Sequence, residues 1–272
     1  MPEILQKVGL HSYRIARRSG VLSWRLGEEL YSRAYFFYKQ RREAPQAAVI
    51  RRVVQPGMLA IDVGANIGFF TTVMARAVGP SGGVLAFEPD AQNVKLLRRT
   101  LRRYRLGNVV VIPSALGEYS GRAELWVNAD HPADHRMYPF EGHAGGYEVD
   151  IVTLDDFMFA RADTRRVSII KIDVQGAELH VLRGMHGMLV RHPSAQLLLE
   201  IAPDHLAEGG TRLAEVRDFL VELGFSPFLL TRRGMVRPES WETVEAVARR
   251  NGYIDVLFSR SVPAELIHRT ST

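Results

Sequence analysis

The 272-residue sequence contains no cysteine. This absence excludes disulfides, thiolate metal sites and cysteine nucleophiles, and it fits a cytoplasmic enzyme. No apolar run approaches the roughly 18 residues that a membrane-spanning helix needs. Residues 1–20 also lack the apolar centre of a signal peptide. We therefore expect neither a membrane partner nor a secretion signal.

The remaining composition is typical of a globular protein with a large core, since 46% of the residues are hydrophobic and 24% are charged. This length allows one large α/β domain with an added N-terminal segment. The net charge is +5, and much of the basic excess lies in residues 41–52 and 95–105. Such clusters permit an anionic or nucleic-acid partner, but basic helix faces are most often only solvated.

Residues 59–70 form the segment around which the chain is organised. Residues 58–63 are mostly apolar, as in a parallel strand that is covered on both faces. Two glycines follow, and a helix is expected over residues 67–78. The free N–H groups at the start of such a helix would point at a bound ligand. The same strand–glycine–helix connection also occurs as a purely structural turn.

The glycine spacing in this turn favours one cofactor class over another. Gly64 and Gly68 allow a ligand to approach the backbone closely, but Asn66 stands where the dinucleotide fingerprint G-x-G-x-x-G has its middle glycine. Asp62 lies two residues before the first glycine, where a carboxylate suits a cationic or hydroxyl-bearing ligand. The turn therefore favours S-adenosylmethionine over a dinucleotide.

Strand and helix patterns alternate after this turn, which predicts right-handed crossovers in a doubly wound sheet of about seven strands. The last two strands form an antiparallel pair around a basic, glycine-bearing loop. A β-hairpin over residues 122–128 and 147–152 interrupts the alternation. The other strands are expected at 83–89, 108–113, 167–173, 196–201, 225–230 and 253–258.

Residues 1–50 are predicted to form an amphipathic helical extension. Leu30, Ala34, Phe37 and Tyr38 share one face at helical spacing. We expect this face to pack on the domain and to close one side of a ligand cleft, because aromatic stripes are most often core. The alternatives are a homodimer contact and a substrate lid.

Four predicted strands end in carboxylates, namely those of Asp62, Glu88, Asp173 and Glu200. In an open α/β sheet the ligand crevice lies outside the carboxyl ends of the strands. Glu88 follows Gly64 by 24 positions, which is the distance at which a strand-end acid accepts hydrogen bonds from ribose hydroxyls. Four such acids predict a ligand site, since burying them for folding alone is unfavourable.

Five motifs follow one another along the chain, namely DVGANIGFFT (62–71), FEP (87–89), SALG (114–117), TLDDF (153–157) and IKIDVQGAE (170–178). This ordered series resembles the FkbM family of S-adenosylmethionine-dependent methyltransferases. The similarity extends over residues 50–260. It implies O-methylation of a hydroxyl on a sugar, a polyketide or another secondary metabolite. The family often carries Glu where this chain has Gln175, so an acid role is not expected at that position.

The resemblance implies a class I methyltransferase fold, a Rossmann-like α/β sheet of seven strands with helices on both faces. We divide the chain into a helical extension (1–50), a methyltransferase domain (51–262) with a substrate or lid loop (128–147), and a tail (263–272). Ser114 is expected at the adenine edge and Asp173 near the methionine end. The predicted cofactor-binding residues are Asp62, Gly64, Ala65, Asn66, Gly68, Glu88, Pro89, Ser114, Ala115 and Asp173.

Methyl transfer to an alcohol requires alignment of the acceptor oxygen with the methyl carbon, and a base helps to remove the hydroxyl proton. We expect His135 or Asp173 to be that base. The spacing of His131 and His135 could also hold a metal, but the proline between them disfavours a rigid helix, and no metal is predicted. The acceptor is expected to contact His131, Asp134, Arg136 and Glu200.

Two other functions are compatible with the sequence. An RNA methyltransferase could use the basic surfaces, but the chain has neither the N/D-P-P-Y/F tetrapeptide nor a catalytic cysteine. A non-catalytic S-adenosylmethionine-binding module is the other alternative, although four strand-end acids favour an enzyme. The sequence therefore disfavours a nucleic acid as the partner and favours a small hydroxylated acceptor.

Overall fold

The computed structural model describes residues 25–128, 134–231, 234–236 and 240–261. Within them, the main sheet has eight strands in the order β10-β9-β11-β8-β7-β1-β2-β3. The predicted seven strands are all present, and β10 adds a three-residue edge strand. Their bounds are β1 (Leu59–Val63), β2 (Gly83–Phe87), β3 (Val109–Ile112), β7 (Val167–Ile172), β8 (Gln196–Ile201), β9 (Ser226–Thr231), β10 (Gly234–Val236) and β11 (Ile254–Ser259).

The strand directions confirm the predicted doubly wound sheet. Strands β3, β2, β1, β7 and β8 are parallel, and β11 runs antiparallel to both β8 and β9. The chain builds outward from β1 through β2 to β3, and then continues on the other side with β7 and β8. The position between β1 and β7 is thus the switch point, where ligands bind in such sheets.

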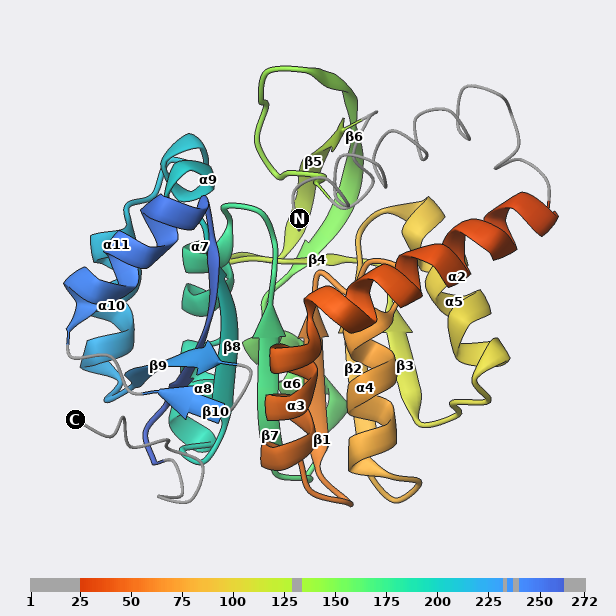
Figure 1. Ribbon diagram of the computed structural model, residues 1–272, viewed down its shortest axis with the longest axis horizontal. Helices are drawn as coiled ribbons and strands as arrows, with labels where there is room; N and C mark the ends of the chain where they lie inside the picture. The colour runs from red at the N-terminus through yellow and green to blue at the C-terminus, as the bar shows by residue number, and fades with distance from the viewer. Residues whose placement is uncertain (1–24, 129–133, 232–233, 237–239, 262–272) are drawn as a thin grey trace.

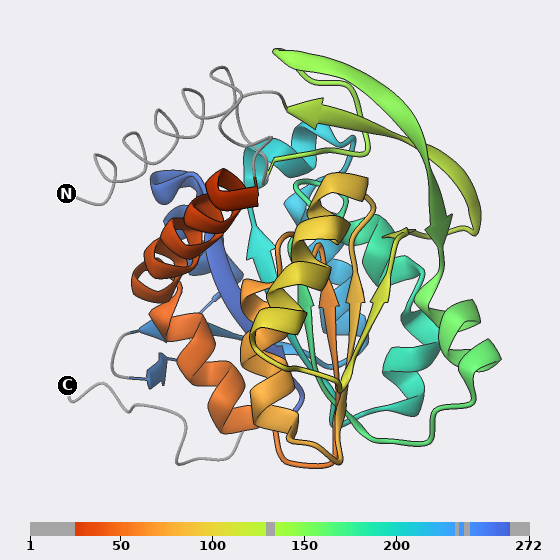
Figure 2. The same cartoon turned by 90° about the vertical axis from the view of Figure 1, so that its right-hand side faces the viewer.

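Helices cover both faces of the sheet (Figures 1 and 2). The strands β1, β2 and β7 are buried at every position, which explains their uninterrupted apolar sequences. One face packs against α2 (Arg25–Arg42), α3 (Ala44–Val53), α4 (Phe69–Val78) and α5 (Ala91–Arg103). The other packs against α6 (Leu154–Arg161), α7 (Glu178–Arg183), α8 (His186–Arg191), α9 (Pro203–Glu208), α10 (Leu213–Glu222) and α11 (Trp241–Asn251).

Helix α11 corrects the expectation of a loop between the last two strands. Its buried residues Val244 and Ala248 lie four positions apart on one face. Only this narrow apolar face marks the helix in the sequence, whereas the arginines and glycines around it are typical of a loop. The antiparallel pairing of β9 and β11 is as predicted.

A small second sheet stands above the carboxyl ends of the main strands (Figure 1). It consists of β4 (Ala115–Leu116), β5 (Gly121–Asn128) and β6 (His143–Val152) in the order β4-β6-β5. The antiparallel pair β5–β6 is the predicted hairpin. It is longer than expected at β6, because His143 already pairs with Asn128. The hairpin thus covers the end of the sheet at which a ligand would bind.

Helix α2 packs on the domain as expected, but with a different face. Phe37 is 57% exposed, with the Arg41 guanidinium stacked over its ring, and Ala34 is exposed as well. Phe36 is the buried aromatic, with its ring centroid 5.7 Å from those of Phe69 and Tyr104. The inner side of α2 packs on the core and also lines the cavity described below, so it carries polar residues such as Lys39. The predicted apolar face is wrong for this reason. Helix α3 runs across the predicted boundary between the helical extension (1–50) and the methyltransferase domain (51–262).

No helix among the described residues is long and apolar enough to cross a membrane. The predicted tail, 263–272, lies outside the described residues, as do residues 1–24 of the extension.

Candidate active site

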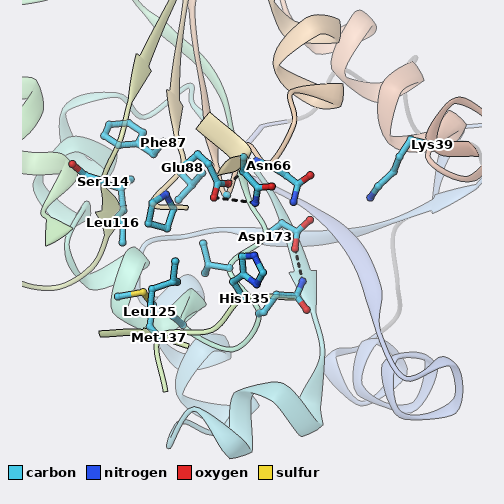
Figure 3. Close-up of a pocket in the computed structure, with 18 of the residues that line it drawn as sticks. Lys39, Asn66, Phe87, Glu88, Ser114, Leu116, Leu125, His135, Met137 and Asp173 are labelled. Carbon is cyan, nitrogen blue, oxygen red and sulfur yellow. Dashed lines mark hydrogen bonds between the residues drawn. The ribbon is translucent and has the colours of Figure 1, made fainter. Parts of the chain in front are cut away.

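A cavity lies at the carboxyl ends of β1, β2 and β7, beside the switch point, where ligands bind in doubly wound sheets (Figure 3). The turn after β1, the ends of β2 and β3, the segment after β7, the hairpin and helix α2 all contribute to its wall. The residues used below that line it are Tyr35, Lys39, Gly64, Asn66, Glu88, Pro89, Ser114, Ala115, His135, Met137, Asp173 and Gln175.

The turn after β1 brings backbone rather than side chains to the cavity. Gly64 has φ +77°, and a Cβ at this position would lie 2.0 Å from the Asp173 carbonyl oxygen. Asn66 has φ +50°, and Asn is among the L-residues that adopt this left-handed conformation most readily. The structure thus explains how Asn66 serves at the position of the missing glycine. Its backbone N–H donates to Glu88 Oε2 at 2.7 Å.

Glu88 follows β2 directly, and its carboxylate is fixed at the cavity wall. Oε1 accepts hydrogen bonds from the Asp90 N–H at 3.0 Å and from Asn93 Nδ2 at 3.3 Å. Burial raises the pKa of Glu88 to about 7, against the opposing effect of the hydrogen bonds from Asp90 and Asn66. The carboxylate is therefore held in one orientation and titrates near neutral pH.

Asp173 follows β7 directly and also faces the cavity. Its Oδ2 accepts from Lys171 Nζ at 3.0 Å, and its Oδ1 accepts from Gln175 Nε2 at 2.6 Å. Burial alone would raise the pKa of Asp173, but the ammonium groups of Lys171 and Lys39 hold it below its usual value. Asp173 is thus an ionised carboxylate at neutral pH, and Gln175 acts as its hydrogen-bond donor.

The other two strand-end acids, Asp62 and Glu200, do not line the cavity. Each stands inside its strand, one residue before the end, whereas Glu88 and Asp173 stand one residue after it. Asp62 is buried and accepts from the Thr71 hydroxyl at 2.5 Å. This hydrogen bond connects β1 to the first turn of α4, and the predicted cofactor contact of Asp62 stays a prediction. Ala65 and Gly68 likewise lie behind the cavity wall.

Glu200 belongs to a buried group of carboxyls behind Asp173. Its Oε1 accepts from Gln175 Nε2 at 2.9 Å, and Asp255 stands opposite it on β11. Burial, followed by the charges of Asp173 and Asp255, raises the pKa of Glu200 well above its usual value. Glu200 therefore keeps its proton to a higher pH than an exposed glutamate does. Its predicted contact with an acceptor stays a prediction.

The segment between β5 and β6 contributes His135 and Met137 to the cavity wall (Figure 3). His135 Nδ1 accepts from the Asn128 backbone N–H at 3.2 Å, and its Nε2 lies 3.9 Å from Asp90 Oδ2. In the neutral ring, an accepting Nδ1 requires the proton on Nε2. This tautomer has no free lone pair for a substrate proton, so the geometry favours Asp173 over His135 as the base.

Arg136 and Asp134 form a buried ion pair beneath the hairpin. Arg136 Nε donates to Asp134 Oδ1 at 2.8 Å, and the guanidinium also contacts Glu208, Tyr138 and His205. Neither residue lines the cavity, so in this arrangement they anchor the hairpin to α9. Their predicted acceptor contacts are untested. His131 lies outside the described residues.

No group of three or more His, Asp or Glu side chains in the described part of the chain is arranged to hold a metal ion. The prediction of a metal-independent site therefore stays open for experiment.

The N-terminal helix α2 contributes two residues that the sequence reading did not identify as site residues. Tyr35 and Lys39 lie four positions apart and line the cavity together. Lys39 Nζ donates to Glu43 Oε1 at 3.1 Å. The spacing of four was the signal available in the sequence, but a lysine on an aromatic helix gives no indication of a cavity until the helix is placed.

Comparison with known proteins connects this site to one family. The model of the methyltransferase FkbM domain matches residues 62–227. "Methyltransferase 1" of Beauveria bassiana is 30% identical over 147 residues, which are 46% of this chain and 57% of that protein. "Methyltransferase sdnD" of Sordaria araneosa is 29% identical over 164 residues, 48% of this chain and 63% of that protein. The chain thus spans about three fifths of the length of these relatives.

Among solved structures, the methyltransferase FkbM of Methylobacillus flagellatus KT aligns with 85% of this chain and 54% of its own. The sequence identity is 17% and the TM-score is 0.48. The assignment of the fold therefore rests on the strand order of this chain and not on that likeness.

Proposed function

The chain belongs to the FkbM family of S-adenosylmethionine-dependent methyltransferases, and on this premise we propose that it methylates a hydroxyl of a sugar, a polyketide or a related secondary metabolite. The observation that carries the proposal is the pair of carboxylates that face one cavity. Glu88 stands at one wall and Asp173 at another. The two have different partners and different pKa values, which suits different tasks.

The residues at the cavity fit S-adenosylmethionine. Glu88 offers two fixed carboxylate oxygens to ribose hydroxyls, and Ser114 with Ala115 lies where the adenine edge is expected. The turn at Gly64 presents backbone without a side chain. Bound S-adenosylmethionine supplies a methyl group on a positively charged sulfur. Leu125 and Met137, from β5 and the segment that follows it, line the cavity and would help to exclude water from the methyl group.

Asp173 is the group we assign to the acceptor hydroxyl. Its carboxylate is held by Lys171 and Gln175, so it cannot swing away, and each oxygen retains a lone pair. A fixed carboxylate orients the acceptor O–H and accepts its proton as the oxygen attacks. Its lowered pKa makes it a weak base, so alignment is the larger part of its contribution.

Replacement of Asp173 by asparagine is expected to lower kcat by about 10²-fold, within the range for lost general-base catalysis. The measurement is transfer of a radiolabelled methyl group to a panel of sugar and polyketide alcohols, with and without divalent metal. The panel includes amines, carboxylates and a structured RNA as other acceptor classes. Turnover of one of these classes alone, or unchanged kcat in Asp173→Asn at saturating substrate, would contradict the proposal.

Cofactor affinity is expected to depend on pH through Glu88. Ribose hydroxyls donate to the ionised carboxylate, so binding is favoured where Glu88 has lost its proton. Because its pKa is about 7 in the free protein, the Kd for S-adenosylhomocysteine should fall about tenfold between pH 6 and pH 8. Calorimetry in two buffers of different ionisation enthalpy should detect proton release at pH 7. A Kd that is constant over this range would contradict the assignment.

A further inference from the structure

The cavity carries opposite charges side by side at its end near α2, with the carboxylate of Asp173 and the ammonium of Lys39. We propose that Lys39 binds the carboxylate of the methionine part of S-adenosylmethionine, so that helix α2 completes the cofactor site. The proposal rests on the proposed function and assigns a cofactor contact to the N-terminal extension. The methionine part of the cofactor carries a carboxylate, and Lys39 offers it a cationic partner, while Asp173 stays available for the acceptor hydroxyl.

The position of Lys39 supports this assignment. Its side chain is 18% exposed, enough to reach the cavity while most of the stem is covered. The ammonium lies 5.9 Å from the ring centroid of Tyr35 and 6.0 Å from that of Phe70, which limits its positions. Its contact with Glu43 uses one of three N–H donors. The remaining donors can serve a ligand without breaking that ion pair.

The other nearby cations cannot take this role. Lys171 is only 2% exposed, donates to Asp173, and lies 4.7 Å from the Phe70 ring centroid. Arg136 is engaged by Asp134 and Glu208 and does not line the cavity. Lys39 is the only lysine or arginine among the described residues that line it. A ligand carboxylate therefore has one side-chain ammonium to bind.

The order of the wall residues matches an adenosine joined to an amino acid. In Figure 3, Ser114 and Leu116 lie at one end, Glu88 in the middle, and Asp173 between Glu88 and Lys39. This order corresponds to adenine at Ser114, ribose at Glu88, the acceptor hydroxyl at Asp173 and the methionine carboxylate at Lys39. Lys39 enters from a different element than the others, so the cofactor would join α2 to the sheet.

The test is a comparison of two ligands by calorimetry on the full chain. One is S-adenosylhomocysteine, and the other is its decarboxylated form, which lacks only the carboxylate. The wild type should bind the first about tenfold more tightly, as expected for one charge-assisted contact. Lys39→Met should lose this preference, with affinity lowered for S-adenosylhomocysteine and unchanged for the decarboxylated ligand. Arg41→Met, on the exposed side of the same helix, should keep it.

The outcomes separate this inference from the proposed function. Equal binding of both ligands by the wild type, or a preference that persists in Lys39→Met, overturns the role of Lys39 and leaves the cofactor assignment intact. If the wild type binds neither ligand, the proposed function fails and this inference with it. Should Lys39→Met not fold, Lys39→Gln is measured with the same expectation, and the wild-type preference must be present in either case.

Discussion

Glu88→Gln is expected to raise the Kd for S-adenosylhomocysteine by about 100-fold. The carboxylate offers acceptors to two ribose hydroxyls, and hydrogen bonds to a charged group contribute about 1.5–3 kcal/mol each. Glu88 also accepts from the N–H groups of Asn66 and Asp90 through different oxygens. The amide keeps only one of these oxygens, so its NH₂ group would face a backbone donor. Loss of about 3 kcal/mol corresponds to the stated change in Kd.

Glu200→Gln is the matched control for this prediction. It is also a carboxyl-to-amide change at a strand end, but Glu200 does not line the cavity. Burial and the charge of Asp173 raise its pKa well above the usual value. The amide oxygen can still accept from Gln175. Because no ribose hydroxyl is assigned to Glu200, we expect less than about a threefold change in cofactor Kd. Equal losses in both variants would contradict the ribose assignment.

Gly64→Ala is expected to destabilise the protein by about 3–5 kcal/mol and to abolish cofactor binding. An L-residue at φ +77° costs about 1–2 kcal/mol, and the new Cβ would lie 2.0 Å from the Asp173 carbonyl oxygen. This contact is with backbone, which cannot rotate away as a side chain would. The turns after β1 and β7 must then separate, and both form the cavity wall. A decrease in Tm of about 10 °C corresponds to this destabilisation.

Gly57→Ala isolates the conformational part of that effect. Gly57 has φ +84°, but its Cβ would meet only Ser81 Oγ, at 3.7 Å. We expect a loss of about 1–2 kcal/mol and unchanged cofactor affinity. Chemical denaturation and calorimetry of both variants measure the two quantities. If the variants are equally destabilised, the close approach of β1 and β7 does not contribute, and the description of the turn is wrong.

Local sequence was sufficient to predict the sheet and the position of its ligand end. Segments 59–63, 83–87 and 167–172 are apolar throughout because both faces of these strands are buried. Asp90 caps α5, with its Oδ1 accepting from the Asn93 N–H at 2.7 Å. Each of these features depends on neighbouring residues along the chain, and so each leaves a pattern that can be read from the sequence.

Which of the four acids face the cavity depends on the tertiary structure. Asp62 and Asp173 look alike in sequence, as acids at the end of an apolar run. Asp62 lies inside β1, where both faces of the sheet are covered, and its carboxylate bonds to Thr71 of α4. Asp173 lies one residue beyond the end of β7 and reaches the cavity wall. The residue at which a strand ends is set by its hydrogen-bonded neighbours, which are distant in the sequence.

The contribution of α2 was decided in the same way. The sequence was enough to predict helices over residues 25–50 and their packing on the domain. It did not determine the face, because Phe36 and Phe37 are equally apolar and only one is buried. Lys39 reaches the cavity through the packing of α2 on a domain whose strands begin twenty residues later. Contacts between segments so far apart depend on how the elements pack, and local pattern carries no information about them.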